Sequence, residues 1–411
     1  MPDPAQLIPS AEAARRLGVR PATLYAYVSR GVVRSRRVPG ARGSWFDPAQ
    51  IDALTRAGSR PGRSGPDLTV TSAITHIDGQ TLSYRGRDAT ELISRASFEA
   101  VASLLWAGQL RHERFDAPKA TTRAARQATR WLPAGARLAD RLVLAVAAAA
   151  TADPLRFDLS PPAVRSVGRL LIAAMVDSLP SRRDGDPPPL ELDGEAPIES
   201  SVAGRLWTRL APDALPQHGA TILNGYLVLL ADHELATSTL AARVAASARA
   251  NPYSAVTSAL GALDGPLHGT VSEEVHALLT EASGPHGATA AVAGRLRRGQ
   301  HVPGFGHALY VDGDPRGVAG LRLLRSFAGN AGAGRRLRVV EEVCAAAGAR
   351  TPTAPNSDFS LGALAFVAGM PSDAGEAIFA VARTAGWIAH VLEEYGEASL
   401  RYRVRADYVG P

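Results

Sequence analysis

The sequence predicts a mainly α-helical protein preceded by a small, separate amino-terminal domain. The chain has 411 residues with 46% hydrophobic and 20% charged residues, which is typical of a globular protein of two or three domains. From residue 67 onward, Ala/Leu/Arg segments with apolar residues at helical spacing dominate, and alternating runs typical of strands are few. Residues 1–65 hold eleven Arg and four acidic residues, a charge of +7, whereas the whole chain is +6. The positive charge therefore belongs to the amino-terminal part, and the remaining residues sum to −1.

The amino-terminal part has the pattern of a helix-turn-helix. "SAEAARRLGV" (Ser10–Val19) predicts a short helix capped by Ser10, and "PATLYAYVSRG" (Pro21–Gly31) predicts a second that starts with Pro. A glycine-containing turn joins them. Two β-prone stretches around a Pro-Gly turn follow in "VVRSRRVPGARGSWF", and Asp47 caps a closing helix in "DPAQIDALTRA". The concentration of arginine indicates a module that faces a polyanion.

A linker separates this module from the body. "GSRPGRSGPD" (Gly58–Asp67) is rich in Gly, Pro and Ser, so we expect a domain over residues 1–58 and a linker over 59–66. The body opens with a short β-prone piece, "AITHIDGQTLSYRG", and then reads as helices interrupted by a Pro-rich acidic loop over Arg182–Pro197. No repeat of 20–50 residues and no coiled-coil heptad is visible.

Composition indicates a cytoplasmic protein. The single cysteine, Cys344, excludes an intramolecular disulfide and suits a reducing compartment. The first residues lack a basic stretch followed by an apolar core, so we expect no secretory signal. The most apolar run, "LVLAVAAAA", is far shorter than the ~20 residues that span a bilayer. We therefore expect no membrane association.

Four polar positions interrupt the apolar pattern of the body. His233 lies in "ADHELATS", His268 in "GPLHG", His307 in "GFGH" and Asp358 in "NSDFS". Taken singly, each histidine is most simply a structural residue, and the "NSD" that contains Asp358 is most simply a helix cap. The histidines also lack the spacing of a zinc site, with no HExxH and no cysteine cluster. We expect no metal.

Considered together, the four positions indicate acid–base chemistry. Glycines beside His268 and His307 indicate that something approaches the backbone closely. Thr270 and Glu273 form a capping-box pattern, so His268 would precede a helix start, where the positive end of the dipole keeps an imidazole neutral. A neutral hydrogen-bond donor, a second histidine and a carboxylate are the groups that an enolisation needs.

At this point the body resembles a known family. The segments "LLADHE", "NPYSAVTSALGALDGPLHG", "VPGFGHALY…DPRG", "NSDFSLGAL" and "RVRADYVG" resemble the citrate synthase family, motif by motif and in order. The resemblance covers residues 67–411. It implies an all-helical homodimer, with a large domain over 67–268 and 376–411 and a small domain over 269–375 that closes over substrate. Residues 8–56 separately resemble a MerR/excisionase-type winged helix-turn-helix.

The resemblance also implies a role for each site residue. His268 would hydrogen-bond the thioester oxygen of acetyl-CoA, Asp358 would take a methyl proton, and His307 would polarise the carbonyl of oxaloacetate. The oxaloacetate carboxylates would be held by His233, Arg316 and Arg383, and by Arg403 reaching into the partner subunit's site. The product citryl-CoA is then hydrolysed to citrate and CoA, a reaction of the tricarboxylic acid cycle. Acetyl-CoA enters as co-substrate, and the resemblance implies neither a permanently bound cofactor nor a metal.

The residues themselves support one of these assignments. Arg383 lies inside an apolar segment with Ile378, Phe379 and Ile388. A buried guanidinium is costly unless a carboxylate meets it, and its planar fork suits a dianionic substrate. Ser357 and the following "FSLGAL" depart from the usual family pattern, so the acyl preference stays open. The alternative is a 2-methylcitrate synthase that uses propionyl-CoA.

A third hypothesis is a transcription regulator whose synthase-like body senses a metabolite. The charge of +7 on residues 1–65 motivates it. Several arginines of the module would contact DNA phosphates: Arg20, Arg34, Arg36, Arg37 and Arg42. The simpler alternative is a docking or stability element that binds no DNA. Because every catalytic position of the family is present, we expect an enzyme first.

Overall fold

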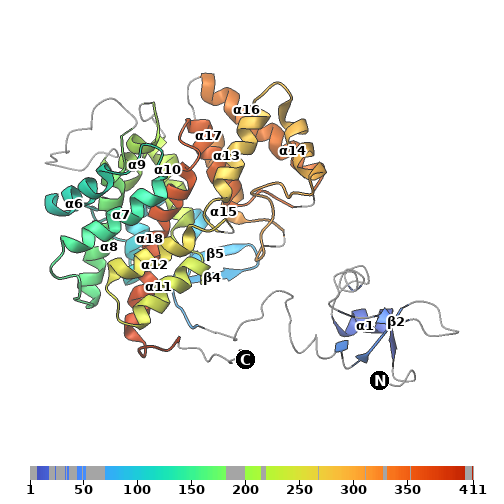
Figure 1. Ribbon diagram of the computed structural model, residues 1–411, viewed down its shortest axis with the longest axis horizontal. Coiled ribbons are helices and arrows are strands. Elements are labelled where there is room, and N and C mark those ends of the chain that lie inside the picture. The colour runs from blue at the N-terminus through green and yellow to red at the C-terminus, as the bar shows by residue number, and fades with distance from the viewer. Residues whose placement is uncertain are drawn as a thin grey trace. The chain divides into compact units, whose positions relative to one another are not determined.

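The computed structural model divides the chain into two compact units, Met1–Val70 and Thr71–Pro411, which we describe separately (Figure 1). The residues that the structure describes are 7–17, 24, 33, 35–36, 44–48, 50–51, 70–181, 200–213, 219–266, 268–310, 312–326, 331–351, 353–402 and 410.

The described residues of the amino-terminal unit include a small antiparallel sheet in the order β1–β3–β2 and a helix. Its elements are β1 (Ile8–Pro9), α1 (Ser10–Arg16), β2 (Ser35–Arg36) and β3 (Trp45–Phe46). Both predicted β-prone stretches are thus strands, and β2 pairs with β3. Six buried residues form a core of their own: Ala13, Ala14, Leu24, Val33, Phe46 and Ile51.

Two predictions for this unit have different outcomes. Ser10 is the first helical residue and not the cap, because Pro9 holds the cap position and no side chain caps α1. The predicted second helix, Pro21–Gly31, lies outside the described residues apart from Leu24, so the helix-turn-helix stays a prediction. The acidic loop over Arg182–Pro197 also lies outside them.

The body begins with the predicted β piece and continues as helices, so the expectation of a mainly α-helical fold is confirmed. Strands β4 (Thr75–Asp78), β5 (Thr81–Tyr84) and β6 (Arg87–Asp88) form an antiparallel sheet in chain order. The helices are α4 (Ala89–Leu92), α5 (Phe98–Ala107), α6 (Lys119–Arg130), α7 (Leu138–Thr151), α8 (Pro161–Ser178), α9 (Val202–Leu210), α10 (Gly219–Leu230), α11 (Thr237–Ser247), α12 (Pro252–Leu263), α13 (Val271–Ala282), α14 (Gly287–Arg297), α15 (Pro315–Arg325), α16 (Ala331–Gly348), α17 (Ser357–Ala368) and α18 (Ala374–Gly396).

Helix α18 is the centre of the body. It is 23 residues long and packs against α5, α7, α8, α10, α11 and α12 (Figure 1). Its residues from Ala374 to Val391 are all buried. Helix α18 carries apolar or small side chains on every face, as expected for a helix in the core. The polar residues that α18 carries, Arg383 and His390 among them, therefore have to find partners inside the protein.

A second group of helices lies at one end of the body. Helix α13 packs on α14 and α17, and α16 packs on α14 and α17 (Figure 1). The capping box predicted for α13 is wrong, because Thr270 has helical dihedral angles and its side chain caps nothing. The chain enters α13 through a turn in which the Gly269 amide donates to the Gly265 carbonyl.

One glycine lets a loop touch α18. The Gly386 amide donates to the carbonyl of Ala231, 2.9 Å away, and a Cβ at position 386 would lie 2.2 Å from Asp232 Oδ1. Only glycine permits that approach. Residues 231–236, between α10 and α11, are therefore held directly on the central helix. Among the residues described, no helix is long and apolar enough to span a bilayer.

Candidate active site

The loop that carries His233 is held at the end of α10. Helix α10 ends at Leu230, and Asp232 and His233 lie in the loop that follows. The hydroxyl of Tyr84, from β5, lies 3.1 Å from the carbonyl oxygens of Val228 and Asp232, at the end of α10. The last carbonyl groups of a helix have no hydrogen-bond partner within the helix. The Tyr84 hydroxyl supplies one at the end of α10.

His233 is buried and neutral. Its Nε2 lies 3.0 Å from the Tyr310 hydroxyl, and its ring packs edge-on against His307 with centroids 5.4 Å apart. Burial, and then the charges of Arg316 and Arg383, hold the pKa of His233 well below its usual value. Burial also raises the pKa of Tyr310 to about 12, so the phenol keeps its proton and can donate it to Nε2. The His233 proton then lies on Nδ1.

His307 presents a protonated Nε2. Its Nδ1 lies 3.1 Å from the backbone nitrogen of Leu309, which can only donate, so the ring proton of a neutral His307 lies on Nε2. Burial and the charge of Arg316 lower the pKa of His307, which favours that neutral form. An Nη2 of Arg316 lies 3.3 Å from the same Nε2. Because both groups are donors, this contact is not a hydrogen bond.

Arg316 is held by an aspartate that sequence analysis missed. Asp314 caps α15 by accepting from the Arg316 amide, and its carboxylate pairs with Arg316 Nε at 3.0 Å and Nη2 at 2.8 Å. The same carboxylate accepts from the Ser357 amide at 3.0 Å. Asp314 thus ties the start of α15 to the start of α17. Its place immediately before Pro315 was a readable cap signal.

Asp358 lies at the first turn of α17 with its carboxylate uncommitted. The expected role as a helix cap belongs to Asn356, whose side chain accepts from the amides of Asp358 and Phe359. The Asn356 amide nitrogen also donates to the Gly306 carbonyl, which fixes the loop carrying His307. No residue in the described part of the chain hydrogen-bonds the Asp358 carboxylate. Removal from water raises its pKa to about 6, although Arg316 opposes the shift.

His268 is a neutral hydrogen-bond donor. Its Nε2 lies 2.8 Å from the Ser238 hydroxyl, and the Trp387 indole nitrogen donates to the same hydroxyl over 3.3 Å. The indole occupies one of the two acceptor sites of the hydroxyl, which favours donation of the serine proton to Nε2 and a ring proton on Nδ1. Burial, followed by the charge of Arg383, lowers the pKa of His268 to about 4. The neutral ring was expected from a helix dipole, and burial is the stronger cause.

Arg383 is a buried cation at the centre of these groups. Its side chain is 1% exposed, its Nε donates to the Leu230 carbonyl at 2.8 Å, and its guanidinium lies 4.4 Å from the Phe379 ring centroid. Burial lowers its pKa to about 10, although Asp232 opposes the shift. Among the described residues, none accepts a hydrogen bond from its two Nη groups. After burial, the charge of Arg383 is among the causes that shift the pKa values of His268, His233 and Asp358.

The structure brings together six of the seven residues predicted for substrate. Arg403 and the predicted DNA contacts Arg20, Arg34, Arg37 and Arg42 lie outside the described residues, whereas Arg36 is exposed on β2. Over the ranges that the structure describes, no cluster of His, Cys, Asp and Glu could hold a metal ion.

A match to a family model identifies the protein family of this chain. The model for the citrate synthase C-terminal domain matches residues 68–405, most of the chain and all of the site. The chain belongs to the citrate synthase family. Members of this family are acyltransferases that condense acetyl-CoA with oxaloacetate and need no metal. The predicted family, enzyme class and fold of the body are thereby confirmed.

Individual members of the family show the same relationship. 2-Methylcitrate synthase 1 of Corynebacterium glutamicum is 31% identical over 336 residues, which cover 79% of this chain and 88% of the relative. Citrate synthase 2 of Bacillus subtilis is 30% identical over 360 residues, covering 84% and 94%. Among solved structures, the Thermoplasma acidophilum citrate synthase, in complex with carboxymethyl coenzyme A and oxaloacetate, matches with a TM-score of 0.69. That match has 26% identity and covers 84% of this chain and 95% of the other.

Proposed function

We propose that this chain condenses acetyl-CoA with oxaloacetate and hydrolyses the product to citrate and CoA. The observation that carries the proposal is that an uncommitted carboxylate, Asp358, and a neutral imidazole, His268, both have pKa values on which the buried cation Arg383 acts. A general base needs a pKa near the working pH, and about 6 meets that requirement for Asp358. A neutral imidazole N–H stabilises an enolate without releasing its proton in advance.

The residues suit each step of this reaction. Asp358 takes a proton from the acyl methyl group, and the Nδ1–H of His268 donates to the thioester oxygen, where the electrons of the broken C–H bond accumulate. The enolate carbon then forms a bond to the carbonyl carbon of oxaloacetate. The Nε2–H of His307 donates to the carbonyl oxygen, which takes up the proton as the bond forms. Water finally attacks the thioester of citryl-CoA, and CoA leaves as the thiol.

Oxaloacetate requires cations, and the site has two. Arg383 has both Nη groups uncommitted among the described residues, and Arg316, although paired with Asp314, brings its Nη2 to 3.3 Å from His307 Nε2. The Nδ1–H of His233 is a third donor. We propose that Arg403 adds a fourth from the partner subunit. Arg–carboxylate pairs in a water-poor site are strong because the hydrogen bonds are charge-assisted.

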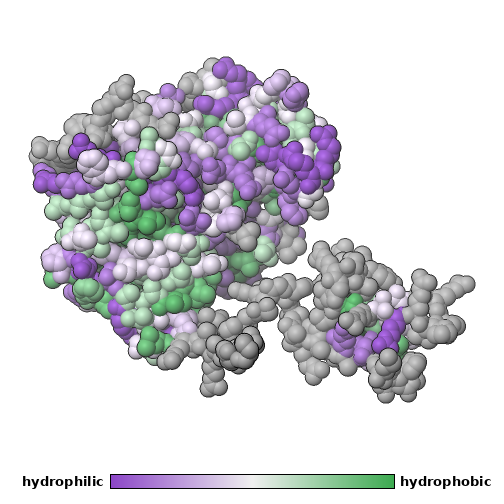
Figure 2. Space-filling model, in the orientation of Figure 1, coloured by the Kyte–Doolittle hydropathy of each residue, from purple (hydrophilic) through white to green (hydrophobic). Residues whose placement is uncertain are grey.

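The crossing of Arg403 requires a homodimer, and one face of the body suits a second copy. Leu144 of α7 and Val244 of α11 are 36% and 45% exposed, and Figure 2 shows apolar and small side chains over α7, α11 and α12. We expect Leu144→Glu to shift the protein from dimer to monomer in light-scattering measurements of mass. The matched substitution Trp131→Glu, at a side chain that is 85% exposed, is expected to leave the dimer intact.

The domain boundaries are part of the proposal. The grouping of α13, α14, α16 and α17 at one end of the body supports a small domain over 269–375 that closes on the large domain over 67–268 and 376–411. His268 would lie at the first hinge, and the second would precede Glu376. Closure excludes water until the carbon–carbon bond has formed.

The choice of acyl group is the main alternative. Relatives named citrate synthase and 2-methylcitrate synthase are 30% and 31% identical to this chain, so similarity does not separate the two substrates. The experiment is to follow CoA release with oxaloacetate and either acetyl-CoA or propionyl-CoA. A higher kcat/KM for acetyl-CoA supports citrate synthase. One methylene is worth about 1–3 kcal/mol in such a comparison, so a tenfold preference for propionyl-CoA would favour the alternative.

A second candidate function concerns the amino-terminal unit. Its charge of +7 and its separate core suggest a DNA-binding domain over residues 1–58, with residues 59–66 as linker. Binding to duplex DNA measured over a range of salt concentrations tests this, because each phosphate contact steepens the fall of log affinity with log salt. A steep negative slope supports DNA binding, and absent or salt-independent binding contradicts it.

A further inference from the structure

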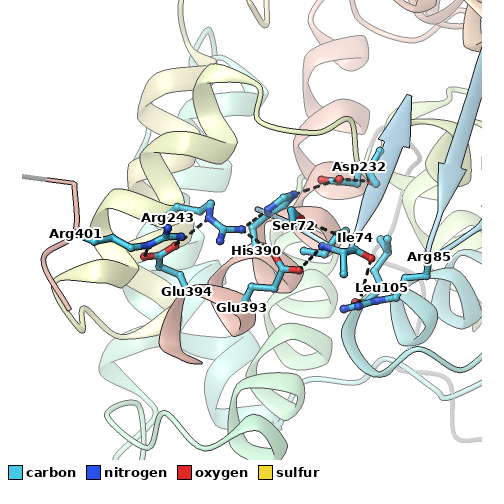
Figure 3. Close-up of polar contacts among 12 residues, drawn as sticks. Ser72, Ile74, Arg85, Leu105, Asp232, Arg243, His390, Glu393, Glu394 and Arg401 are labelled. Carbon is cyan, nitrogen blue, oxygen red and sulfur yellow. Dashed lines mark hydrogen bonds and ion pairs between the residues drawn. The ribbon is translucent and has the colours of Figure 1, made fainter. Parts of the chain in front are cut away.

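A chain of buried charges runs between α11 and α18, beside the residues assigned to substrate. The guanidinium of Arg243, from α11, is fully buried and contacts three side chains of α18 (Figure 3). Its Nη1 lies 2.8 Å from His390 Nδ1 and 2.8 Å from Glu393 Oε2, and its Nε lies 3.0 Å from Glu394 Oε2. A buried ion cluster of this kind is weak evidence for stability, because apolar side chains of the same volume often serve as well.

The position of Arg243 is fixed through the partners of Glu393 and Glu394. Glu394 also accepts from Nε and Nη2 of Arg401, at 2.7 Å and 2.6 Å, and from the Tyr402 hydroxyl at 2.9 Å. Glu393 accepts from the backbone amide of Ala73 at 2.9 Å, just before β4. Residue 73 and residues 401–402 therefore hold the two glutamates, and through them the guanidinium that faces His390 (Figure 3).

The orientation of His390 follows from that of Arg243. A guanidinium can only donate, so His390 Nδ1 accepts and the ring proton lies on Nε2. This Nε2 lies 3.3 Å from Oδ2 of Asp232, and both side chains are completely buried. His390 therefore transmits the fixed position of Arg243 to a single carboxylate oxygen at the start of the loop that carries His233.

Asp232 connects this group of buried charges to the residues assigned to oxaloacetate. It precedes His233 directly, its Oδ2 accepts from Thr75 of β4, and its Oδ1 lies against the backbone of Gly386. Burial opposes its charge, but His390 and Arg383 hold the pKa of Asp232 below its usual value. The ionised carboxylate is thus a buried negative charge that acts on Arg383.

We propose that His390 is a positioning residue of the oxaloacetate site: held by Arg243, it fixes Asp232, and Asp232 keeps His233 and Arg383 where the substrate carboxylates require them. This inference rests on the proposed function, because it takes oxaloacetate as the ligand of His233 and Arg383. His390 contacts none of the groups assigned to acyl-CoA, so its influence is expected on oxaloacetate alone.

Two substitutions separate the two hydrogen bonds of His390. His390→Gln places an amide N–H near the position of Nε2 and keeps the donor to Asp232. His390→Asn places an oxygen near the position of Nδ1, so it keeps the acceptor for Arg243 and loses the donor to Asp232. We expect His390→Asn to raise the Kd and KM for oxaloacetate about tenfold or more, the equivalent of one hydrogen bond to a charged group. The KM for acetyl-CoA should change less than twofold, and His390→Gln should retain oxaloacetate binding within about threefold.

The matched control is Thr384→Val, which removes another buried polar group of α18, one that bonds only to Met175 and its own helix backbone. It is expected to leave the oxaloacetate Kd unchanged. Should His390→Asn fail to fold, Asp232→Asn is the second test. It keeps the shape of the Asp232 side chain and removes its charge, and we expect the same tenfold weakening of oxaloacetate binding.

Calorimetric titration of oxaloacetate gives the readout without turnover. If the wild type binds oxaloacetate but releases no CoA, the proposed function fails while the test of His390 proceeds. Equal Kd values for His390→Asn and wild type would overturn the positioning role, as would equal weakening by His390→Gln and His390→Asn. A wild type that does not bind oxaloacetate overturns both proposals.

Discussion

The Ser238 hydroxyl lies 2.8 Å from His268 Nε2, and Trp387 donates to the same oxygen, which favours donation from the serine to the ring. Trp387→Phe keeps the aromatic volume and removes that donor, so the serine proton is no longer committed to Nε2. We expect kcat to fall about tenfold, within the range of general acid–base effects, because a fraction of His268 would carry its proton on the wrong nitrogen. Nitrogen NMR of His268 measures the tautomer directly.

The oxaloacetate Kd is the control for that substitution, because the Trp387 indole donates to Ser238, which is not assigned to oxaloacetate. An unchanged tautomer in Trp387→Phe, or a loss confined to oxaloacetate binding, would show that the indole does not act through His268.

The pH dependence of turnover should follow Asp358. Burial raises the pKa of this carboxyl to about 6, and it acts as a base only when deprotonated. We expect kcat/KM for acetyl-CoA to be constant at neutral pH and to fall tenfold per pH unit below about 6. His268, with a pKa of about 4, stays neutral through that range and cannot produce this limb. A profile that is flat down to pH 5 would contradict the assignment.

The raised pKa of Asp358 predicts that its ionised carboxylate destabilises the folded protein. Its folded pKa of about 6 lies above the ordinary 3.8, so the folded protein binds the proton more tightly than the unfolded chain. Stability is therefore lost as pH rises from about 4 to about 6, and the loss persists at higher pH. We expect Asp358→Asn to raise Tm at pH 8, with little change at pH 4. Thermal unfolding at the two pH values measures the difference. A Tm of Asp358→Asn below that of the wild type at pH 8 would be inconsistent with a destabilising buried carboxylate.

Gly386 should be intolerant of the smallest side chain. In Gly386→Ala, the new methyl group would lie 2.2 Å from Asp232 Oδ1 and 2.5 Å from the Ala231 carbonyl oxygen, so the loop carrying His233 has to move. We expect a loss of about 1–3 kcal/mol in the free energy of unfolding, as for other overpacked sites, together with weaker oxaloacetate binding. Gly396→Ala, at the exposed end of the same helix with open space around it, is the control and should be neutral.

The sequence allowed the helical class, the β4–β6 sheet and the family to be predicted, because each depends on local pattern or on motifs in order. The chemical state of single residues depends on tertiary contacts and was only partly accessible. The neutral ring of His268 was expected from a capping box at Thr270 that does not exist, and burial lowers its pKa instead. Asn356, and not Asp358, caps α17, which a sequence containing both within "NSD" could not decide.

The residues that sequence analysis missed act through other residues. Tyr310, Ser238 and Trp387 are ordinary in their helices and loops, and only the folded arrangement shows which histidine each one orients. His390 gave no signal for the same reason, since its partners Asp232 and Arg243 lie about 150 residues away. Long-range pairs of this kind cannot be read from spacing along a single segment.

The most direct test of the central claim is CoA release from acetyl-CoA and oxaloacetate by the full chain and by Asp358→Asn. The wild type is expected to release CoA only when oxaloacetate is present. The variant should lose at least about a hundredfold in kcat, as general bases typically contribute that much, while its oxaloacetate Kd stays close to that of the wild type. Absence of CoA release by the wild type, or full activity in Asp358→Asn, would contradict the claim that Asp358 and His268 form the centre of a citrate synthase.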